Sequence, residues 1–287
     1  MMTDNAYAPY SLDREEHRRF SRAEQVRHLE AQGFVILPDA LDDDHVARLK
    51  VELEGLPMRP SFYTDAPSFA TVPPHTHGPE SGGLVGHAPV VEFVKHLLGD
   101  ELVFMHSFYI QSHPGAPELE LHTDFQPYGS TYSQWLESCP IRIRVLYYLD
   151  DTRLDRSALR ILPRSHISMH ADAQPYRRIK SHAEEVMVPL NAGDAFVFAV
   201  RMFHGVGPNT TQERRGMMEY DYRPIWARPY GPLPNWSAAE LRFVPEPFRD
   251  MAADRNRMDM AFEFDTKRAS VETTGPGIGP ARWGTAA

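Results

Sequence analysis

The sequence predicts a mainly β protein with flanking helices, in which N-terminal helices pack outside a double-stranded β-helix, or jelly-roll, core. Two observations predict this fold class. Helical patterns come first in the chain, and from Glu101 the pattern changes to short strand-like runs separated by turn residues. Many short strands in series are typical of two packed antiparallel sheets, and the preceding helices then cover the outside.

The composition is that of an ordinary globular protein. The chain has 287 residues, of which 42% are hydrophobic and 24% are charged, as in typical soluble domains. A single body of this size buries about three quarters of its unfolded surface. The formal net charge of −9 argues against a nucleic-acid-binding surface, which is normally basic. No part of the sequence indicates a particular oligomeric state.

Other features indicate a cytoplasmic protein. Cys139 is the only cysteine, so no intramolecular disulfide can form. Residues 1–20 lack the apolar core of a signal peptide, and no stretch approaches the roughly eighteen apolar residues of a membrane span. We expect residues 1–20 to be flexible unless they dock, residues 21–270 to form one jelly-roll domain with helical and loop insertions, and residues 271–287 to form a flexible tail.

The first helix and strand have clear boundaries. Ser21 can cap a helix, and Glu24 three residues later completes a capping box. The helix is expected to run to about Gln32 and to end at Gly33, because glycine accepts the left-handed conformation that ends many helices. Residues 34–37, Phe-Val-Ile-Leu, then predict a strand.

A second helix and a long loop are expected next. Residues 42–44 are all aspartate and favour a helix start, which continues to about residue 54. Residues 56–89 are rich in Pro, Gly, Ser and His and predict an irregular loop, long enough to suggest a lid or binding loop. Its histidines, His75, His77 and His87, are either solvated loop residues or part of a second metal site or substrate contact.

The rest of the chain predicts strands, with a short amphipathic helix before them at residues 89–98. The strand-like runs are 102–111, 141–150, 158–162, 185–189, 195–201 and 216–223. Residues 128–140 are expected to be irregular, and residues 248–257 to form a helix near the C-terminus.

A histidine and an aspartate two residues apart form the central motif. Alternate side chains of a strand point to the same face, so His122 and Asp124 are expected to project together. A third ligand from a distant histidine would complete the two-histidine, one-carboxylate set that suits non-haem Fe(II). The alternative for this pair is an ordinary buried His–Asp hydrogen bond.

The third ligand is predicted at His204. It closes the apolar run after Gly193-Asp194 and precedes a Gly/Pro/Asn loop, and another strand-like run begins near Arg215. We expect a strand–loop–strand hairpin that brings His204 and Arg215 to one cavity. Arginine binds a carboxylate through two parallel N–H···O bonds. The alternative is that Arg215 lies on the surface and Arg214, or neither residue, makes this contact.

These motifs resemble the phytanoyl-CoA dioxygenase family of Fe(II)/2-oxoglutarate-dependent oxygenases. The resemblance covers roughly residues 25–223. It rests on His122-x-Asp124, on His204 with Arg215 eleven residues later, on residues 158–166, similar to the family's strand ending in Pro-Gly-Ser-His, and on residues 33–38, similar to its first helix-to-strand junction.

The resemblance implies a reaction and the residues that support it. His122, Asp124 and His204 would bind Fe(II) as metal ligands and catalytic residues, and Arg215 would bind the far carboxylate of 2-oxoglutarate. The cosubstrates are 2-oxoglutarate and O₂, the cosubstrate product is succinate, and hydroxylation of a C–H bond is the default outcome. Related halogenases have a small residue in place of the acid, so Asp124 argues against halogenation.

Three further residues match positions near the cosubstrate. Phe108 and Leu146 match family positions that line the cosubstrate pocket, although both also suit plain core packing. Thr123 lies between two expected ligands and either contacts the cosubstrate or faces away from it as an ordinary strand residue.

The strand at residues 141–149 suggests the charge of the substrate. Arg142 and Arg144 alternate with apolar residues, on the same face as Leu146, which the resemblance places at the cavity. A buried guanidinium needs an anionic partner, either a protein acid or a group of the substrate. We therefore predict a small anionic or zwitterionic substrate anchored by Arg144, with Gln111, Tyr128 and Trp135 completing the pocket wall.

The competing interpretation is a non-catalytic, cupin-like binder of small molecules, or a jelly-roll enzyme that uses another divalent metal. The sequence contains no Ser–His–Asp elbow, phosphate-binding loop or dinucleotide-binding glycine motif. Arg215 beside the metal set favours the oxygenase, because a simple binder has no need to hold 2-oxoglutarate.

Overall fold

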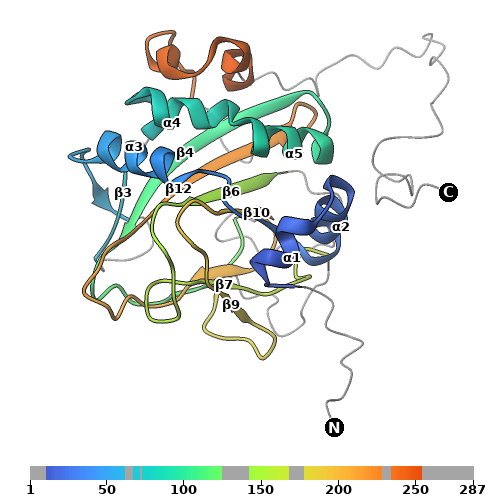
Figure 1. Cartoon of the computed structure of the whole chain (residues 1–287), viewed down its shortest axis with the longest axis vertical. Helices are drawn as coiled ribbons and strands as arrows, with labels where there is room; N and C mark the ends of the chain where they lie inside the picture. Colours follow the sequence, from blue (N-terminus) through green and yellow to red (C-terminus); the bar gives the residue numbers. More distant parts are fainter. Residues whose placement is uncertain are drawn as a thin grey trace, which may run out of the picture.

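Two antiparallel β-sheets form the centre of the protein (Figure 1). The computed structural model describes residues 11–61, 67–71, 73–124, 142–167, 178–227 and 234–253. Within these residues the larger sheet has seven strands, in the spatial order β1 (Phe34–Leu37), β10 (Ala195–Ala199), β6 (Ile143–Tyr148), β12 (Arg215–Pro224), β4 (Leu102–Ser112), β3 (Ser68–Thr71) and β2 (Arg59–Pro60).

The smaller sheet faces the larger one. Among the described residues it has five strands, in the order β8 (Arg178–Ile179), β5 (Leu119–His122), β11 (His204–Val206), β7 (Leu159–Ile161) and β9 (Val186–Val188). One buried cluster joins side chains of both sheets, among them Leu146 and Phe198 from the larger sheet and Leu159 and Ile161 from the smaller. Two antiparallel sheets packed in this way confirm the predicted jelly-roll core.

Side-chain alternation along β6 separates two environments. Ile143, Val145 and Tyr147 point to the outer face of the larger sheet, where they join the main hydrophobic cluster. Leu146 and Tyr148 point between the sheets. The sequence predicted this division, because successive side chains of a strand face opposite sides of the sheet.

Helices cover the outer face of the larger sheet (Figure 1). α2 (Arg22–Gln32) begins with the predicted capping box between Ser21 and Glu24 and ends at Gly33, whose φ of 94° is left-handed. α3 (Asp43–Leu53) begins at its N-cap Asp42, as predicted, and α5 (Ala88–Leu98) is the expected amphipathic helix. Their apolar faces bury Val26, Leu49 and Phe93, among others, in the main cluster.

The first described residues are docked onto the domain. α1 (Arg14–Arg19) lies within the segment that was expected to be flexible unless docked. Arg14 bonds the buried carboxylate of Asp194 at 2.6 and 2.7 Å. The predicted C-terminal tail at residues 271–287 lies outside the described residues.

The prediction of an irregular loop over residues 56–89 is wrong. The segment contains β2, β3, the 3₁₀ helices η1 (Pro74–Thr76) and η2 (Leu84–Gly86), and the short helix α4 (Pro79–Gly83). β3 pairs with β4 and so extends the larger sheet. Such short elements carry too few residues for a periodic pattern, and proline at the start of η1 and α4 is compatible with a helical first turn.

The histidines of this segment do not all have the expected exposure. His77 is exposed, whereas His75 is fully buried, with its Nδ1 2.7 Å from Ser107 Oγ. His87 is partly buried, with its Nδ1 3.1 Å from the hydroxyl of Tyr147. The interpretation as solvated loop histidines is therefore wrong for His75 and His87. Within the described residues, none of the three belongs to a group that could hold a metal.

The predicted hairpin around His204 is also wrong. β10 and β12 belong to the larger sheet, but β11, which begins at His204, pairs with β5 and β7 in the smaller one. The chain therefore crosses between sheets twice in this region.

Near the C-terminus, residues 240–252 form the 3₁₀ helices η3 (Glu240–Phe243) and η4 (Glu246–Ala252) in place of the expected helix at 248–257. The last residues of that expected helix lie outside the described part of the chain. No helix in the described part of the chain is long and apolar enough to cross a membrane.

Candidate active site

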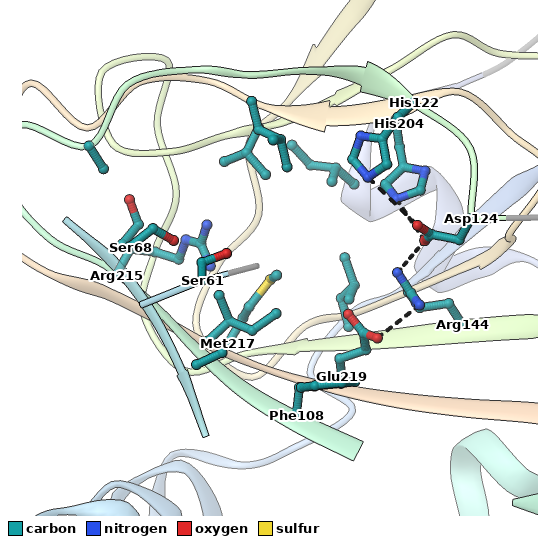
Figure 2. Close-up of a pocket in the computed structure, with 18 of the residues that line it drawn as sticks. Ser61, Ser68, Phe108, His122, Asp124, Arg144, His204, Arg215, Met217 and Glu219 are labelled. Carbon is teal, nitrogen blue, oxygen red and sulfur yellow. Dashed lines mark hydrogen bonds and ion pairs between the residues drawn. The ribbon is translucent and has the colours of Figure 1, made fainter. Parts of the chain in front are cut away.

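His122, Asp124 and His204 converge on one point between the sheets (Figure 2). His122 and His204 are directly paired across β5 and β11, and their ring centroids lie 4.5 Å apart. Asp124 lies just beyond the end of β5, where its backbone N–H donates to the carbonyl of Val200 at 3.2 Å. One ligand atom from each of the three residues lies within 4.8 Å of the others. The predicted convergence is confirmed, although Asp124 is not itself in a strand.

Backbone contacts set the orientation of both imidazole rings. His122 Nδ1 lies 2.9 Å from the carbonyl oxygen of Glu120, and His204 Nδ1 lies 2.9 Å from that of Met202. A carbonyl can only accept, so each Nδ1 carries the proton and each Nε2 presents a lone pair. The two Nε2 atoms lie 3.7 and 3.3 Å from oxygens of Asp124. Two imidazole nitrogens and a carboxylate this close together are suited to binding a cation.

Arg144 on β6 is ion-paired with Asp124. Burial alone would oppose ionisation of Asp124, but the nearby charge of Arg144 favours it, and the pKa of Asp124 lies well below its usual value. Asp124 is therefore a carboxylate at neutral pH, the form that binds metal.

Protein acids already pair with Arg144. Its Nε lies 2.9 Å from Asp221 Oδ1, and its Nη2 lies 2.9 Å from Glu219 Oε1. Asp221 is fully buried and also binds Arg142. The sequence left open whether Arg144 would pair with the protein or with a substrate, and the structure provides three protein carboxylates. This pairing removes the reason for assigning Arg144 as a substrate anchor.

A cavity of about 360 Å³ extends from the three ligands to Arg215. Figure 2 shows Arg215, Ser61 and Ser68 on the opposite side of the cavity from His122 and His204. The side chain of Arg215 is buried, and its Nε and Nη1 atoms have no hydrogen-bond partner in the described part of the chain. Burial lowers its pKa. Unsatisfied guanidinium N–H groups in a cavity wall are suited to a carboxylate ligand.

The neighbouring arginine has a different position. Arg214 is exposed, and it does not line this cavity. Of the two candidates that the sequence offered for the cosubstrate carboxylate, only Arg215 faces the space that contains the predicted metal ligands.

The other predicted site residues divide into three groups. Phe108 and Leu146 line the cavity, and Leu146 also packs in the cluster between the sheets. Thr123 and Gln111 do not line it, which corrects their assignment. Gln111 lies on the other face of β4, where its amide nitrogen bonds the hydroxyl of Tyr109 at 2.9 Å. The remaining two residues, Tyr128 and Trp135, lie outside the described residues.

Sequence reasoning missed the acids of β12. Glu219 lines the cavity, and burial raises its pKa to about 8 despite the nearby charge of Arg144. Asp221, two residues later on the same face, stays ionised because the charges of Arg142 and Arg144 outweigh its burial and lower its pKa. Two acids at alternate positions within an apolar strand were a signal in the sequence, since buried acids require partners.

His106, Glu219 and Asp221 form a second group close enough to share a metal. Two guanidinium groups, from Arg142 and Arg144, already bind Asp221. His106 Nε2 lies 3.3 Å from Asp221 Oδ2. Asp221 is therefore already neutralised by two protein cations, which makes this group less suited to a metal than the group at His122.

Comparison with known families supports a common ancestry over most of the chain. A family model described as phytanoyl-CoA dioxygenase (PhyH) matches residues 29–217. Two curated proteins are similar in sequence. Dioxygenase trt7 of Aspergillus terreus is 23% identical over 228 residues, which cover 75% of this chain and 77% of that protein. Dioxygenase ALT11 of Alternaria alternata is 23% identical over 216 residues, covering 67% and 68%.

Solved structures share the fold. HygX from Streptomyces hygroscopicus, with nickel and 2-oxoglutarate bound, superposes with a TM-score of 0.60 at 16% identity, covering 71% of this chain and 87% of HygX. SnoN, described as a non-heme alpha ketoglutarate dependent epimerase from nogalamycin biosynthesis, also has a TM-score of 0.60, at 19% identity, covering 79% and 92%.

Proposed function

The chain belongs to the phytanoyl-CoA dioxygenase family and is a dioxygenase, and we propose that it uses Fe(II), 2-oxoglutarate and O₂ to hydroxylate a C–H bond of a small molecule. One observation carries the proposal. Two histidines and an aspartate converge at one end of a cavity, and a buried arginine with unsatisfied N–H groups lines the same cavity.

The three convergent residues fit an iron ion. His122 and His204 would bind it through Nε2, because their Nδ1 protons are engaged by backbone carbonyls. Asp124 would contribute an ionised carboxylate. Two neutral imidazoles and one carboxylate leave positions on the metal for other ligands, which is the arrangement that suits non-haem Fe(II). HygX with nickel and SnoN with Fe3+ are solved structures of the same fold with a metal bound.

Arg215 fits the far carboxylate of 2-oxoglutarate. Its Nε and Nη1 atoms have no hydrogen-bond partner among the described residues, so the guanidinium has N–H groups left to donate to a carboxylate. Burial makes these bonds stronger than they would be in water, because the local dielectric constant is low. Met217 and Leu146 line the cavity with Arg215 and provide apolar contact for the methylene groups of the cosubstrate.

The residues of this chain hold the reactants in place and exclude water. When bound, iron with 2-oxoglutarate and O₂ would supply the oxidising power that removes hydrogen from a C–H bond; 2-oxoglutarate would be converted to succinate and CO₂, and one oxygen atom of O₂ would enter succinate and the other the hydroxylated product. Phe108, Ile110 and Phe198 provide apolar walls, which leave less of the cavity surface able to bind water. Dry surroundings protect the reaction from competing water.

Hydroxylation is the simplest outcome for this ligand set. Asp124 occupies the carboxylate position that related halogenases leave open, so halogenation is not expected. SnoN is described as an epimerase and SnoK as a carbocyclase. Proteins of this fold thus include enzymes described by other reactions, and we take hydroxylation as the reaction to test first.

The substrate prediction changes with the pairing of Arg144. An anionic or zwitterionic substrate was inferred from that residue, whose charge is already balanced by the carboxylates of Asp124 and Asp221. The Glu219 side chain borders the cavity (Figure 2). We therefore propose a small molecule with a hydroxyl or amino group that Glu219 can bind; a zwitterion still meets this requirement.

A screen for stimulated succinate formation tests the function. The iron-loaded enzyme is supplied with 2-oxoglutarate, O₂ and pools of small metabolites sorted by charge and by hydroxyl or amino content. We expect succinate release above the background rate with hydroxylated or amino compounds, accompanied by a product that is heavier by one oxygen atom. Stimulation by simple carboxylates alone would contradict the substrate class, and substrate-dependent turnover without 2-oxoglutarate would contradict the cosubstrate.

A further inference from the structure

Few backbone hydrogen bonds hold Asp124 in the position that metal binding requires. It lies two residues beyond the end of β5, outside the ladder that holds His122 opposite His204. A single backbone bond of 3.2 Å to Val200 holds its N–H among the described residues. A carboxylate at the end of a short side chain rotates freely unless another group fixes it. Some further contact must therefore orient the oxygens of Asp124 toward both histidines.

Arg144 provides this contact. The Nη1 of Arg144 binds Asp124 Oδ2, the oxygen that lies 3.3 Å from His204 Nε2, and the other oxygen then lies 3.7 Å from His122 Nε2. Each oxygen of the carboxylate thus faces one of the two imidazoles. Figure 2 shows the ion pairs that run from Glu219 through Arg144 to Asp124.

Arg144 is itself held rigidly. Across the sheet it is paired with Phe198 on one side and Asp221 on the other, so its backbone is in the centre of the larger sheet. Its Nε and Nη2 bind both oxygens of Asp221 at 2.9 and 3.1 Å. Asp221 is fully buried and is also bound by Arg142. A guanidinium that is held along one edge by a carboxylate can use its remaining N–H groups to orient a second carboxylate.

We propose that Arg144 is a positioning residue that fixes the carboxylate of Asp124 for the metal, and that Asp221 and Glu219 in turn fix Arg144. The inference rests on the proposed function, since it presumes that His122, Asp124 and His204 bind a divalent cation. It replaces the role of substrate anchor that the sequence suggested for Arg144. Groups that orient metal ligands typically change metal affinity or activity by about 10- to 100-fold when they are removed.

The chain offers a matched control in Arg142. Both arginines are buried on the same face, and both bind Asp221, but within the described part of the chain only Arg144 of the two contacts Asp124. Arg142→Gln and Arg144→Gln therefore remove the same chemical group from the same network. Only the second change releases the predicted metal ligand.

Binding of Co(II) to the full chain, measured by calorimetry without oxygen or cosubstrate, tests the inference. We expect Arg144→Gln to weaken Co(II) binding about 10- to 100-fold, Arg144→Lys to give an intermediate loss, and Arg142→Gln to change it by less than about threefold. Thermal unfolding of each metal-free variant, followed by circular dichroism, reports the cost to the fold separately.

The outcomes separate this inference from the proposed function. Wild-type protein that does not bind Co(II) would contradict the metal site itself. Wild-type binding with unchanged affinity in Arg144→Gln, or an equal loss in Arg142→Gln, would overturn the positioning role alone. If Arg144→Gln does not fold, Arg144→Lys decides: wild-type Co(II) affinity in that variant would assign Arg144 to stability only, and a selective loss would support the proposal.

Discussion

His122 and His204 face each other across neighbouring antiparallel strands, with 4.5 Å between their ring centroids. The residues are 82 positions apart in the chain (204 minus 122), and only the pairing of β5 with β11 brings them together. This pairing also determines where Asp124, just beyond the end of β5, can reach. The proposed metal site thus depends on the smaller sheet, whereas Arg215 comes from the larger one.

The three predicted metal ligands should each be necessary. We expect His122→Ala, Asp124→Ala and His204→Ala each to reduce Co(II) or Fe(II) binding at least about a hundredfold, because each removes one of three protein ligands. Calorimetric titration measures the affinity, and circular dichroism checks the fold. His77→Ala, a change at an exposed histidine outside the cavity, serves as the control. Wild-type affinity in any of the three ligand variants would remove that residue from the site.

The two neighbouring arginines should differ in their effect on 2-oxoglutarate. Arg215→Ala should raise the 2-oxoglutarate concentration required for half-maximal succinate release about ten- to hundredfold, since hydrogen bonds to charged groups contribute roughly 1.5–3 kcal/mol. Arg215→Lys should rescue only part of this, because an ammonium lacks the planar fork. Arg214→Ala is the matched control and should have little effect, because Arg214 is exposed. A larger effect at Arg214 would show that the wrong neighbour was chosen.

Gly205 should be required for the pairing that forms the site. A Cβ atom at Gly205 would lie 2.4 Å from the carbonyl oxygen of Leu119 on β5, so Gly205→Ala must push β11 away from β5. We expect a loss of about 1–3 kcal/mol in the free energy of unfolding, measured with denaturant, together with weaker metal binding. Gly83→Ala is the control, since no atom lies within 4 Å of the added Cβ. Equal stability of the two variants would contradict the close approach of β5 and β11.

Buried neutral histidines should make the fold sensitive to acid. Burial lowers the pKa of His75 to about 3, although the charge of Glu240 opposes this. Below about pH 6.5 the unfolded chain binds a proton at His75 that the folded chain does not bind. The free energy of unfolding therefore falls as the pH falls from 6.5 toward 3, whereas above pH 6.5 neither state is protonated and this loss is absent. Each such histidine contributes a slope of about 1.4 kcal/mol per pH unit.

His75→Gln isolates this contribution. Between about pH 6 and pH 4 the free energy of unfolding of the variant should fall less steeply than that of the wild type, by about 1.4 kcal/mol per pH unit. Carboxylates titrate in the same range, but they are common to both proteins and cancel in the comparison. Parallel curves for the two proteins would mean that His75 becomes protonated in the folded state.

Local patterns in the sequence predicted the helices and the central strands well. The capping box at Ser21 and Glu24, the left-handed Gly33 and the alternation of β6 all depend on interactions within a few residues. Such signals are visible without knowledge of the fold. The proposed metal ligands were predicted by their spacing and by family resemblance, and the structure brings these three residues together.

Long-range pairing accounts for what the sequence did not predict. β11 has three residues and lies in a different sheet from β10, so the run that contains them both looked like one arm of a hairpin. Gln111 was assigned to the pocket wall, but the direction of β4 turns it to the opposite face. The partners of Arg144 were missed because Asp221 follows it by 77 residues and meets it only across the β6–β12 pair.

The central claim is that one cavity holds Fe(II) and 2-oxoglutarate together, and a single optical titration tests it most directly. Under anaerobic conditions 2-oxoglutarate is added to the Fe(II)-loaded protein while the visible spectrum is recorded. We predict a weak charge-transfer band that saturates with 2-oxoglutarate, is absent in Asp124→Ala and requires far more 2-oxoglutarate in Arg215→Ala. Wild-type protein that binds Fe(II) but develops no band at saturating 2-oxoglutarate would contradict the claim and favour a metal-binding protein without this cosubstrate.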